Sequence, residues 1–372
     1  MDVNLRRLAR FLLLLVAMLE TKGAFADVQE PAVSVDVGYQ LEAVRNVGGG
    51  LRSGSQWHDA ALLDVALDTA RAGWWRGGTL FFEGVLNHGG DPSARLIGDA
   101  QTASNIADGN RADVHQFWYA HRIGVAELLV GLHDLNSVFY VVDSAGLFLN
   151  SSFGIGPEIS VNVPASLWPR AGGAVVAGYA DGAFAGHVGV YDGDPATRAI
   201  RPGGEGLMLI AEGGWHAATG ALKLGAWRHT GQKTGPDGRG FGSDNGLYVI
   251  AERTALARDA MVLTLFLQAG LAQRDRNLIG DYLGFGMHLD APLPGRARDA
   301  FGLAVARAGF TPVARRVNGW TRAETAIEVT YDMAVTDWLH MQPSLQLILH
   351  PSGDAAVPAA RVGLLRVRVD IP

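Results

Sequence analysis

The chain has 372 residues, of which 48% are hydrophobic and 49 are glycine, and it contains no cysteine. The absence of cysteine excludes disulfide bridges, zinc–thiolate sites, a cysteine nucleophile and a lipid-modified cysteine anchor. A formal net charge of -6 argues against general binding to nucleic acid.

Residues 1–26 have the features of a secretory signal peptide. Three arginines precede a nine-residue apolar run from Phe11 to Leu19, and Ala24 and Ala26 provide a small-residue cleavage site. A nine-residue helix is too short to span the ~30 Å of hydrocarbon in a bilayer. The sequence therefore predicts export through the Sec pathway and a mature domain over residues 27–372.

After residue 26, apolar and polar residues alternate, a pattern typical of strands with one apolar and one polar face. The alternation is clearest over 323–335, where Ile327 and Val329 share one face and Glu328 lies on the other. We count sixteen such segments, near residues 33–44, 62–70, 78–88, 114–124, 127–133, 172–180, 183–192, 206–217, 220–230, 245–255, 259–272, 279–290, 297–308, 323–335, 337–349 and 359–370.

The connectors between these segments alternate in length. Those after even-numbered segments are mostly tight, whereas those after odd-numbered segments are mostly long, as at 89–113, 134–171 and 309–322. A soluble β-sandwich, the alternative fold, has no reason to keep long loops at one end. An outer-membrane barrel combines an even strand number with short periplasmic turns and longer outer loops. The sequence therefore predicts an all-β fold, a 16-stranded antiparallel transmembrane β-barrel in the outer membrane.

The two faces of each strand have different environments in such a barrel. The apolar face contacts lipid, and the polar face lines a lumen that sixteen strands leave open to water. Large charged groups on the polar faces suit a wet channel, because an unpaired charge is costly in a dry interior. We therefore expect the apolar residues to form a lipid-facing surface in place of a core.

Several motifs, in order, resemble those of the carbohydrate-selective porins of the OprB family. The stretches that carry the resemblance are GDAQTASNI at 98–106, FWY at 117–119, GLHDLNSVF at 131–139, FLNSSFG at 148–154, VYDGD at 190–194, and the elements at 324–331 and 339–351. The resemblance runs from about residue 35 to 370. It implies a sixteen-stranded outer-membrane porin that passes sugars by diffusion.

The longest connector, residues 134–171, follows the fifth segment, and the resemblance implies that it folds into the lumen and narrows it. Sugar hydroxyls suit Arg, Asp, Glu and Asn partners, and the C–H faces of a sugar suit an aromatic ring such as Trp168. Acidic and basic side chains together favour neutral polar solutes over phosphate. The candidate pore-lining residues are Asp99, Asn105, Asp134, Asn136, Asn150, Trp168, Arg170, Glu324, Glu328, Asp332, Arg366 and Arg368.

Structural roles remain open for some of these candidates. The charged rows on 323–335 and 359–370 could form a salt-bridge lattice that stiffens the wall, and residues 150–152 could form a turn. Two other functions also remain open: a general porin without sugar preference, and a non-channel barrel that serves as an adhesin or anchor.

The sequence contains no H-E-x-x-H, G-x-S-x-G or P-loop motif, so we expect no enzymatic activity, cofactor or metal. The expected partners are sugars, outer-membrane lipid and lipopolysaccharide, the barrel-assembly machinery, and further copies of the chain in a homo-oligomer.

Overall fold

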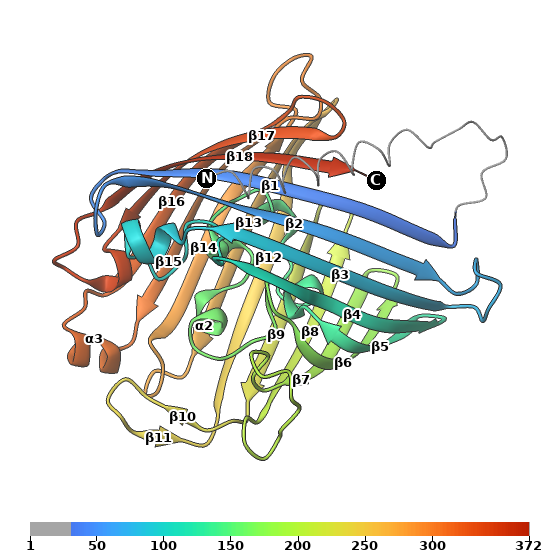
Figure 1. Ribbon diagram of the computed structural model, residues 1–372, viewed down its shortest axis with the longest axis horizontal. Coiled ribbons are helices and arrows are strands. Elements are labelled where there is room, and N and C mark those ends of the chain that lie inside the picture. The colour runs from blue at the N-terminus through green and yellow to red at the C-terminus, as the bar shows by residue number, and fades with distance from the viewer. Residues whose placement is uncertain (1–30, 372) are drawn as a thin grey trace. The chain divides into compact units, whose positions relative to one another are not determined.

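The computed structural model describes residues 31–371, so the predicted signal peptide lies outside the described residues. Over this range sixteen antiparallel strands form one closed barrel, in which β1 pairs with β18 (Figure 1). The barrel strands are β1 (Val33–Gly48), β2 (Gly54–Asp68), β3 (Gly78–Gly89), β4 (Arg111–Ile123), β5 (Ala126–His133), β6 (Gly172–Asp181), β7 (Phe184–Asp192), β8 (Leu207–Ala217), β9 (Gly220–His229), β12 (Asp244–Arg258), β13 (Met261–Ala272), β14 (Ile279–Asp290), β15 (Ala300–Phe310), β16 (Ala323–Ala334), β17 (Leu339–Leu349) and β18 (Ala360–Ile371).

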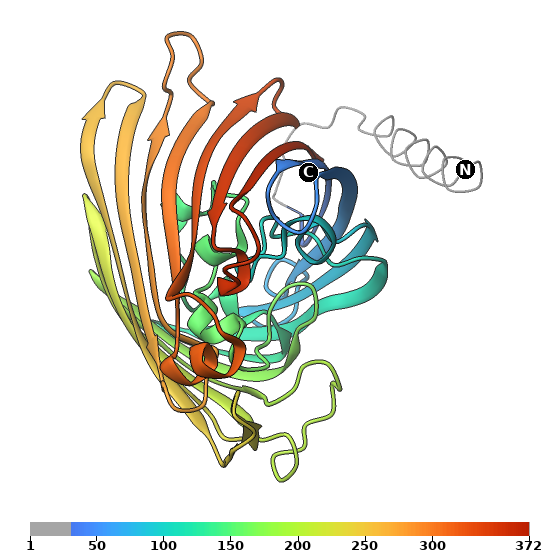
Figure 2. The ribbon, with the colours of Figure 1, turned by 90° about the vertical axis from the view of Figure 1, so that its left-hand side faces the viewer.

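The remaining elements lie in the connectors. A separate two-stranded hairpin is formed by β10 (Lys233–Thr234) and β11 (Gly240–Phe241), and the α-helices are α2 (Pro157–Ser160) and α3 (Pro312–Asn318). Single 3-10 turns occur at Leu135–Ser137, Asp143–Ala145, Ser151–Phe153 and Pro351–Gly353, and a π turn at Ser93–Ile97. The hairpin and α3 lie at the same end of the barrel (Figures 1 and 2).

Every one of the sixteen predicted segments overlaps a barrel strand, so the predicted fold is confirmed. The largest boundary error is at β2, which begins at Gly54 and not near 62. Polar residues on both faces, such as His58 and Asp59, hide the hydrophobic alternation there. The hairpin was not predicted, because two-residue strands are too short to show a period.

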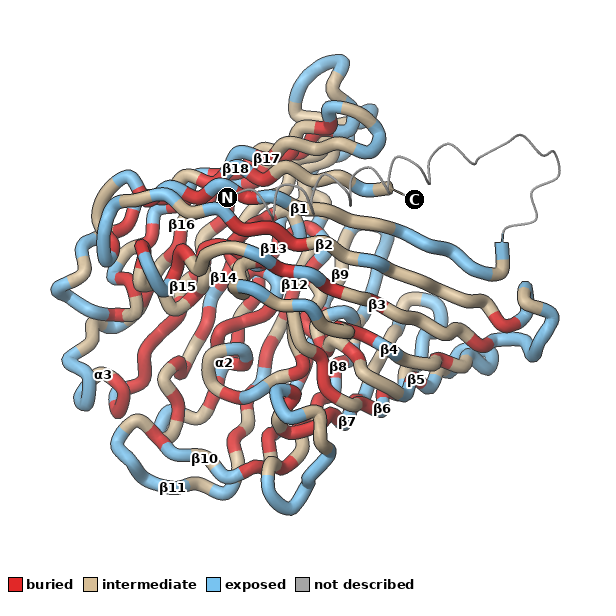
Figure 3. Tube along the Cα trace, in the orientation of Figure 1, coloured by how far each residue is buried: buried red, intermediate tan, exposed pale blue. Residues whose placement is uncertain are grey.

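The outer face of the barrel is apolar. Along β13, Leu265 and Leu267 are 45% and 40% exposed, whereas Phe266 between them and Gln268 after them are 4% and 0% exposed. Figure 3 shows buried residues interspersed with exposed ones along the strands. An outward band of leucine, valine and phenylalanine fits contact with lipid hydrocarbon. Within residues 31–371, no helix has the length and apolar character needed to cross a membrane.

The inside of the barrel holds an apolar core, which corrects the expectation of a lipid-facing surface without a core. Residues 134–171, which we call the inner loop, fold into the barrel (Figures 1 and 2). Phe148 and Phe153 of this loop pack against Phe266 of β13, with ring centroids 5.7 and 6.1 Å apart. A Cβ at Gly302 would lie 2.7 Å from Phe148, so the glycine makes room for the ring. Alternation predicts which residues share a face but not what covers that face.

Candidate functional site

A wall glutamate holds the turn of the inner loop by its backbone. Glu328 on β16 accepts hydrogen bonds from the backbone N–H groups of Leu149 and Asn150, at 2.9 and 3.0 Å. The Ser344 hydroxyl on β17 donates a third, at 2.8 Å. Glu328 is 0% exposed, so its carboxylate lies behind the loop and not on an open surface. A buried carboxylate needs such donors, because unpaired charge is costly in a dry interior.

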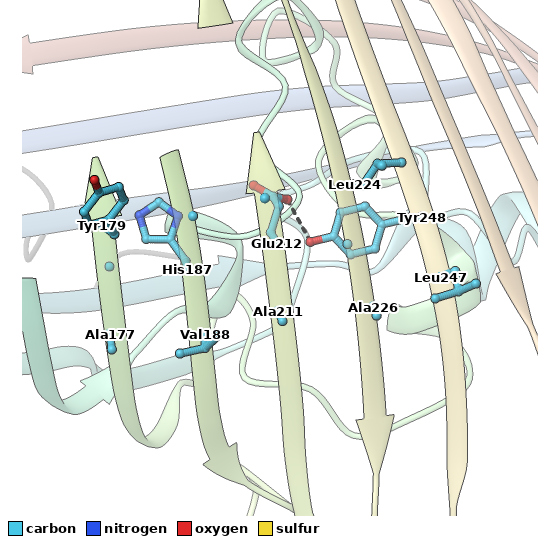
Figure 4. A pocket seen from close by; sticks show the side chains of 14 residues that line it. Ala177, Tyr179, His187, Val188, Ala211, Glu212, Leu224, Ala226, Leu247 and Tyr248 are labelled. Atoms are coloured by element: carbon cyan, nitrogen blue, oxygen red, sulfur yellow. Dashed lines mark hydrogen bonds between the residues drawn. The ribbon is translucent and has the colours of Figure 1, made fainter. Parts of the chain in front are cut away.

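Two more glutamates hold the first half of the inner loop in the same way. Glu212 on β8 accepts the N–H of Tyr140 at 2.9 Å and the hydroxyl of Tyr248 at 2.7 Å (Figure 4). Glu252 on β12 accepts both the N–H and the hydroxyl of Ser144, at 2.9 and 2.6 Å. The inner loop has little regular structure, so these side chains satisfy N–H groups that no helix or strand would pair.

A second connector, residues 90–110, is held by Glu324. The carboxylate accepts the N–H groups of Ala100 and Gln101 at 2.8 and 2.9 Å, and that of Ser352 at 2.6 Å. Glu324 is 0% exposed. Asp99 lies close by, and burial, together with the negative charge of Glu324, raises the pKa of the Asp99 carboxyl to about 7. These two acidic groups therefore lie inside packed loop structure.

A polar cavity of about 550 Å³ remains between the two connectors and the wall formed by β1, β2 and β18. Its wall includes Gln40 and Leu62, and its loop side includes Gln101 and Thr102. The structure brings six of the twelve candidate residues together around this cavity: Asn105, Asp134, Asn136, Trp168, Arg366 and Arg368. The volume falls within the usual range for small-molecule sites.

The two arginines of the cavity are paired with carboxylates. The Arg366 guanidinium donates to Glu42 from Nε at 2.6 Å and to the Asn105 side chain from Nη2 at 2.5 Å. Arg368 donates to Asp332 at 3.3 Å and to Asp370 at 2.9 Å, and its side chain is 30% exposed. Because each cation has an acidic neighbour, this side of the cavity carries little unbalanced charge.

Trp168 and Asp134 form part of the opposite side. Trp168 lies near the end of the inner loop and packs edge-to-face on His115, with ring centroids 5.2 Å apart. Asp134 is the first residue after β5, and its carboxylate is 3.4 Å from Nε2 of His115. The cavity thus has an aromatic ring and a carboxylate on one side and paired arginines on the other.

The other candidates do not line this cavity. Asn150 is buried, and its amide donates to Gln346 at 3.3 Å. Asp332 is 9% exposed and lies between Arg368 and His340. Nε of Arg170 lies 3.7 Å from Oδ2 of Asp113. Glu324 and Glu328 are buried, and Asp99 is half-buried with both carboxylate oxygens out of contact with solvent. Among residues 31–371, no three His, Asp or Glu side chains converge as metal ligands would.

Sequence reasoning missed Glu42 and His115. Glu42 occupies an ordinary inward position on β1, and nothing in its neighbours marks it as the partner of Arg366. His115 stands next to Gln116, and this pair of polar residues interrupts the alternation of the fourth segment. Such an interruption is the signal that could have identified His115, because bulges produce it.

A second hollow, of about 730 Å³, lies on β6 to β9 and β12 (Figure 4). It is lined mainly by small apolar residues such as Ala177, Val188, Ala211 and Ala226, and it shares no lining residue with the polar cavity. Its polar lining residues include His187, Glu212 and Tyr248, and Glu212 and Tyr248 are hydrogen-bonded to each other.

Comparison with known proteins identifies the family. Residues 58–370 match the model of the family described as "Carbohydrate-selective porin, OprB family". Porin B of Pseudomonas aeruginosa is 23% identical over 410 residues, which cover 93% of this chain and 89% of that protein.

Solved porins share the fold. The high-pH structure of Pseudomonas putida OprB matches with a TM-score of 0.82 at 19% identity, covering 91% of this chain and 94% of that one. Its low-pH structure gives a TM-score of 0.59, and a Rhodopseudomonas blastica porin variant gives 0.52 at 13% identity. Each covers 91% of this chain, with 93% and 100% of the other chain covered. The chain belongs to the OprB family of carbohydrate-selective porins.

Proposed function

We propose that the polar cavity between the inner loop and β1, β2 and β18 is the passage for neutral sugars, and that Trp168 is its main sugar contact. The single observation that carries this proposal is the placement of Trp168 on a 550 Å³ polar cavity inside a closed barrel. The chain is a sugar-selective outer-membrane porin by family, and the proposal concerns the residues that provide the selectivity.

The chemistry of the lining suits a sugar. A sugar ring has C–H faces that pack on an indole and hydroxyls that exchange hydrogen bonds with amides, carboxylates and guanidinium groups. Asn105, Asn136 and Asp134 supply amide and carboxylate groups, and Arg368 supplies a partly exposed guanidinium. Several weak contacts in sequence allow both entry and exit, whereas one tight site would stall diffusion.

The paired charges favour neutral solutes. Arg366 and Arg368 each have an acidic neighbour, so neither offers the unbalanced positive charge that an anion would need. A phosphate-selective pore would instead need a ring of unpaired cations. We therefore assign neutral mono- and small oligosaccharides as the substrates, and we assign no catalytic step to the chain.

Conductance across planar bilayers tests the proposal. Purified full-length protein is expected to give ion current that falls as a neutral hexose or a maltose-type oligosaccharide is added. Trp168→Ala is expected to weaken this block about threefold to tenfold, the effect of losing one aromatic contact. Trp57→Ala is the matched control, because Trp57 is 57% exposed on the outer face of β2. An equal effect of both substitutions would remove Trp168 from the site.

One observation favours an alternative, the non-channel barrel. The apolar side chains of the inner loop fill much of the barrel interior, as an anchor or adhesin with a plugged lumen would require. That alternative predicts negligible current in the same bilayers. Current that sugars leave unchanged would instead indicate a general porin without sugar preference.

The export route and the partners follow from the same assignment. We propose that residues 1–26 direct Sec export and are removed to leave a domain over 27–372, which the barrel-assembly machinery inserts. In the outer membrane the apolar outer face would contact lipid and lipopolysaccharide, and a homo-oligomer would form through part of the same face.

A further inference from the structure

The proposed sugar site has a support in the barrel wall, a β-bulge at His115. Between β3 and β4, Glu83 pairs with Gln116, and the next residue, Gly84, pairs with Val114, so His115 has no partner across the ladder. Strict alternation would send His115 and Gln116 to opposite faces, yet both contact the inner loop and are 2% and 8% exposed. A bulge inserts one residue and re-aims a side chain, and this one turns the His115 ring inward, against Trp168 and Asp134 behind the cavity lining.

The His115 ring contacts three groups at once. Its Nδ1 is hydrogen-bonded to the Glu83 carboxylate, and its Nε2 lies 3.4 Å from the Asp134 carboxylate. The ring edge packs against Trp168 at 5.2 Å between centroids, with the planes at 78°. Nε2 faces the Asp134 carboxylate without making a hydrogen bond. One wall side chain thus contacts both Asp134 and Trp168, which line the cavity.

These contacts lie where the two ends of the inner loop meet. The Gln116 side chain accepts the N–H of Asp134 at 3.1 Å, and Leu135 donates to the Ser166 carbonyl at 2.7 Å. The Ser166 hydroxyl in turn donates to the His133 carbonyl at 2.7 Å. The bulge therefore supports the closed base of the loop, and a change at His115 reaches both of its ends.

We propose that His115 is the positioning residue of the sugar site. It orients Trp168 toward the cavity through their edge-to-face contact and acts on sugar preference through that ring. His115 is not part of the cavity lining, so it does not touch the sugar itself. The titratable groups near its ring are Glu83, Asp64 and His133 on the wall strands and Asp134 on the inner loop. This inference rests on the proposed role of Trp168.

A double-mutant cycle in planar bilayers tests it, with full-length protein and a neutral hexose as the probe. His115→Leu removes the ring edge and the hydrogen bond to Glu83, and we expect it to weaken sugar block about threefold to tenfold. His229→Leu is the matched control: His229 is also a buried histidine of the barrel wall, but its ring contacts the Gly193 carbonyl and the Gly231 N–H, which lie outside the inner loop. We expect it to change block less than about twofold. Combining His115→Leu with Trp168→Ala should weaken block no more than Trp168→Ala alone, because His115 acts through Trp168.

The outcomes separate this inference from the function it rests on. If Trp168→Ala weakens block and His115→Leu does not, or if their effects add, the positioning role is overturned while the sugar site stands. If Trp168→Ala itself has no effect, the proposed site fails. Heat-dependent gel mobility first checks that each variant is folded. Should His115→Leu not fold, His115→Gln keeps hydrogen-bonding ends without the ring, and wild-type block in that variant would also overturn the proposal.

Discussion

Asn150 and Glu328 are 178 positions apart in the sequence, and the backbone N–H of Asn150 donates a 3.0 Å hydrogen bond to the Glu328 carboxylate. This contact joins the turn of the inner loop to the middle of β16. The backbone hydrogen bonds within the loop form local turns, so acceptors on the wall determine where those turns lie. The shape of the passage therefore depends on a small number of buried carboxylates.

Removing the Glu328 carboxylate should release the loop without unfolding the barrel. Glu328→Ala leaves two buried N–H groups without an acceptor, at a cost of about 1–3 kcal/mol each. We expect larger single-channel conductance, weaker sugar block and faster protease cleavage within 134–171. Glu127→Ala is the control, because Glu127 pairs with the exposed Arg122 near a short turn. Wild-type conductance in Glu328→Ala would contradict the anchoring role.

Docking of the inner loop should weaken as pH rises, because of Glu158 on α2. Glu158 is fully buried, its carboxylate accepts the Tyr140 hydroxyl at 3.0 Å, and burial raises its pKa from 4.5 to about 7. A raised folded-state pKa means that the neutral form is favoured in the docked loop. The stabilisation is fully present below about pH 4.5 and is lost as pH rises through about 7, with an upper limit of about 3 kcal/mol.

Hydrogen exchange measures this effect. Backbone amides around α2, corrected for intrinsic rates, should exchange faster at pH 8 than at pH 5. Glu158→Gln should remove most of the pH dependence. Asp237→Asn, in the β10–β11 hairpin that we call the outer hairpin, should leave it unchanged. If these amides exchanged more slowly at higher pH, the pH dependence would have the opposite sign, and Glu158 would be excluded as its cause.

The attachment of the outer hairpin to the rest of the barrel depends on Lys233. Its ammonium group donates to Asp244 at 2.6 Å and to the Asn162 carbonyl at 2.6 Å, which ties the hairpin to β12 and to the inner loop. Lys233→Met leaves Asp244, which is 1% exposed, without its cation, and breaking such a pair costs about 3–5 kcal/mol. We expect unfolding at lower temperature or denaturant concentration. Arg239→Met on the same hairpin removes an exposed pair with Asp237 and should cost less than about 1 kcal/mol.

On the outer face of β13, a charged substitution should be tolerated only near the end of the strand. Leu267 lies in the middle of the strand, and Leu271 is the residue before the last. An arginine at the bilayer midplane costs about 2–4 kcal/mol, and one near the interface about 0–1 kcal/mol. Leu267→Arg should therefore reduce folding into lipid vesicles far more than Leu271→Arg. Equal yields for the two would indicate that this strand does not face hydrocarbon.

The sequence by itself determined the barrel and its strand number. Alternation is a local property of neighbouring residues, so it identified all sixteen strands and showed that Leu267 and Glu328 lie on opposite kinds of face. The lengths of the connectors then predicted that long loops gather at one end of the barrel. The motifs, which follow one another in the order found in the family, indicated that family. Trp168 and Asn136 reached the candidate list because aromatic and amide residues stand out in the long connector.

Only the tertiary structure decided which polar residues face the cavity. Glu324 and Glu328 are buried under backbone N–H groups more than 170 positions away, and no local pattern could reveal those donors. The same holds for the apolar core around Phe148, since its partners come from strands distant in the sequence. His115 reached its position behind Trp168 through a bulge, where one extra residue changes the face that a period of two predicts. Faces are set by neighbours in the chain, but what covers a face is set by contacts between distant segments.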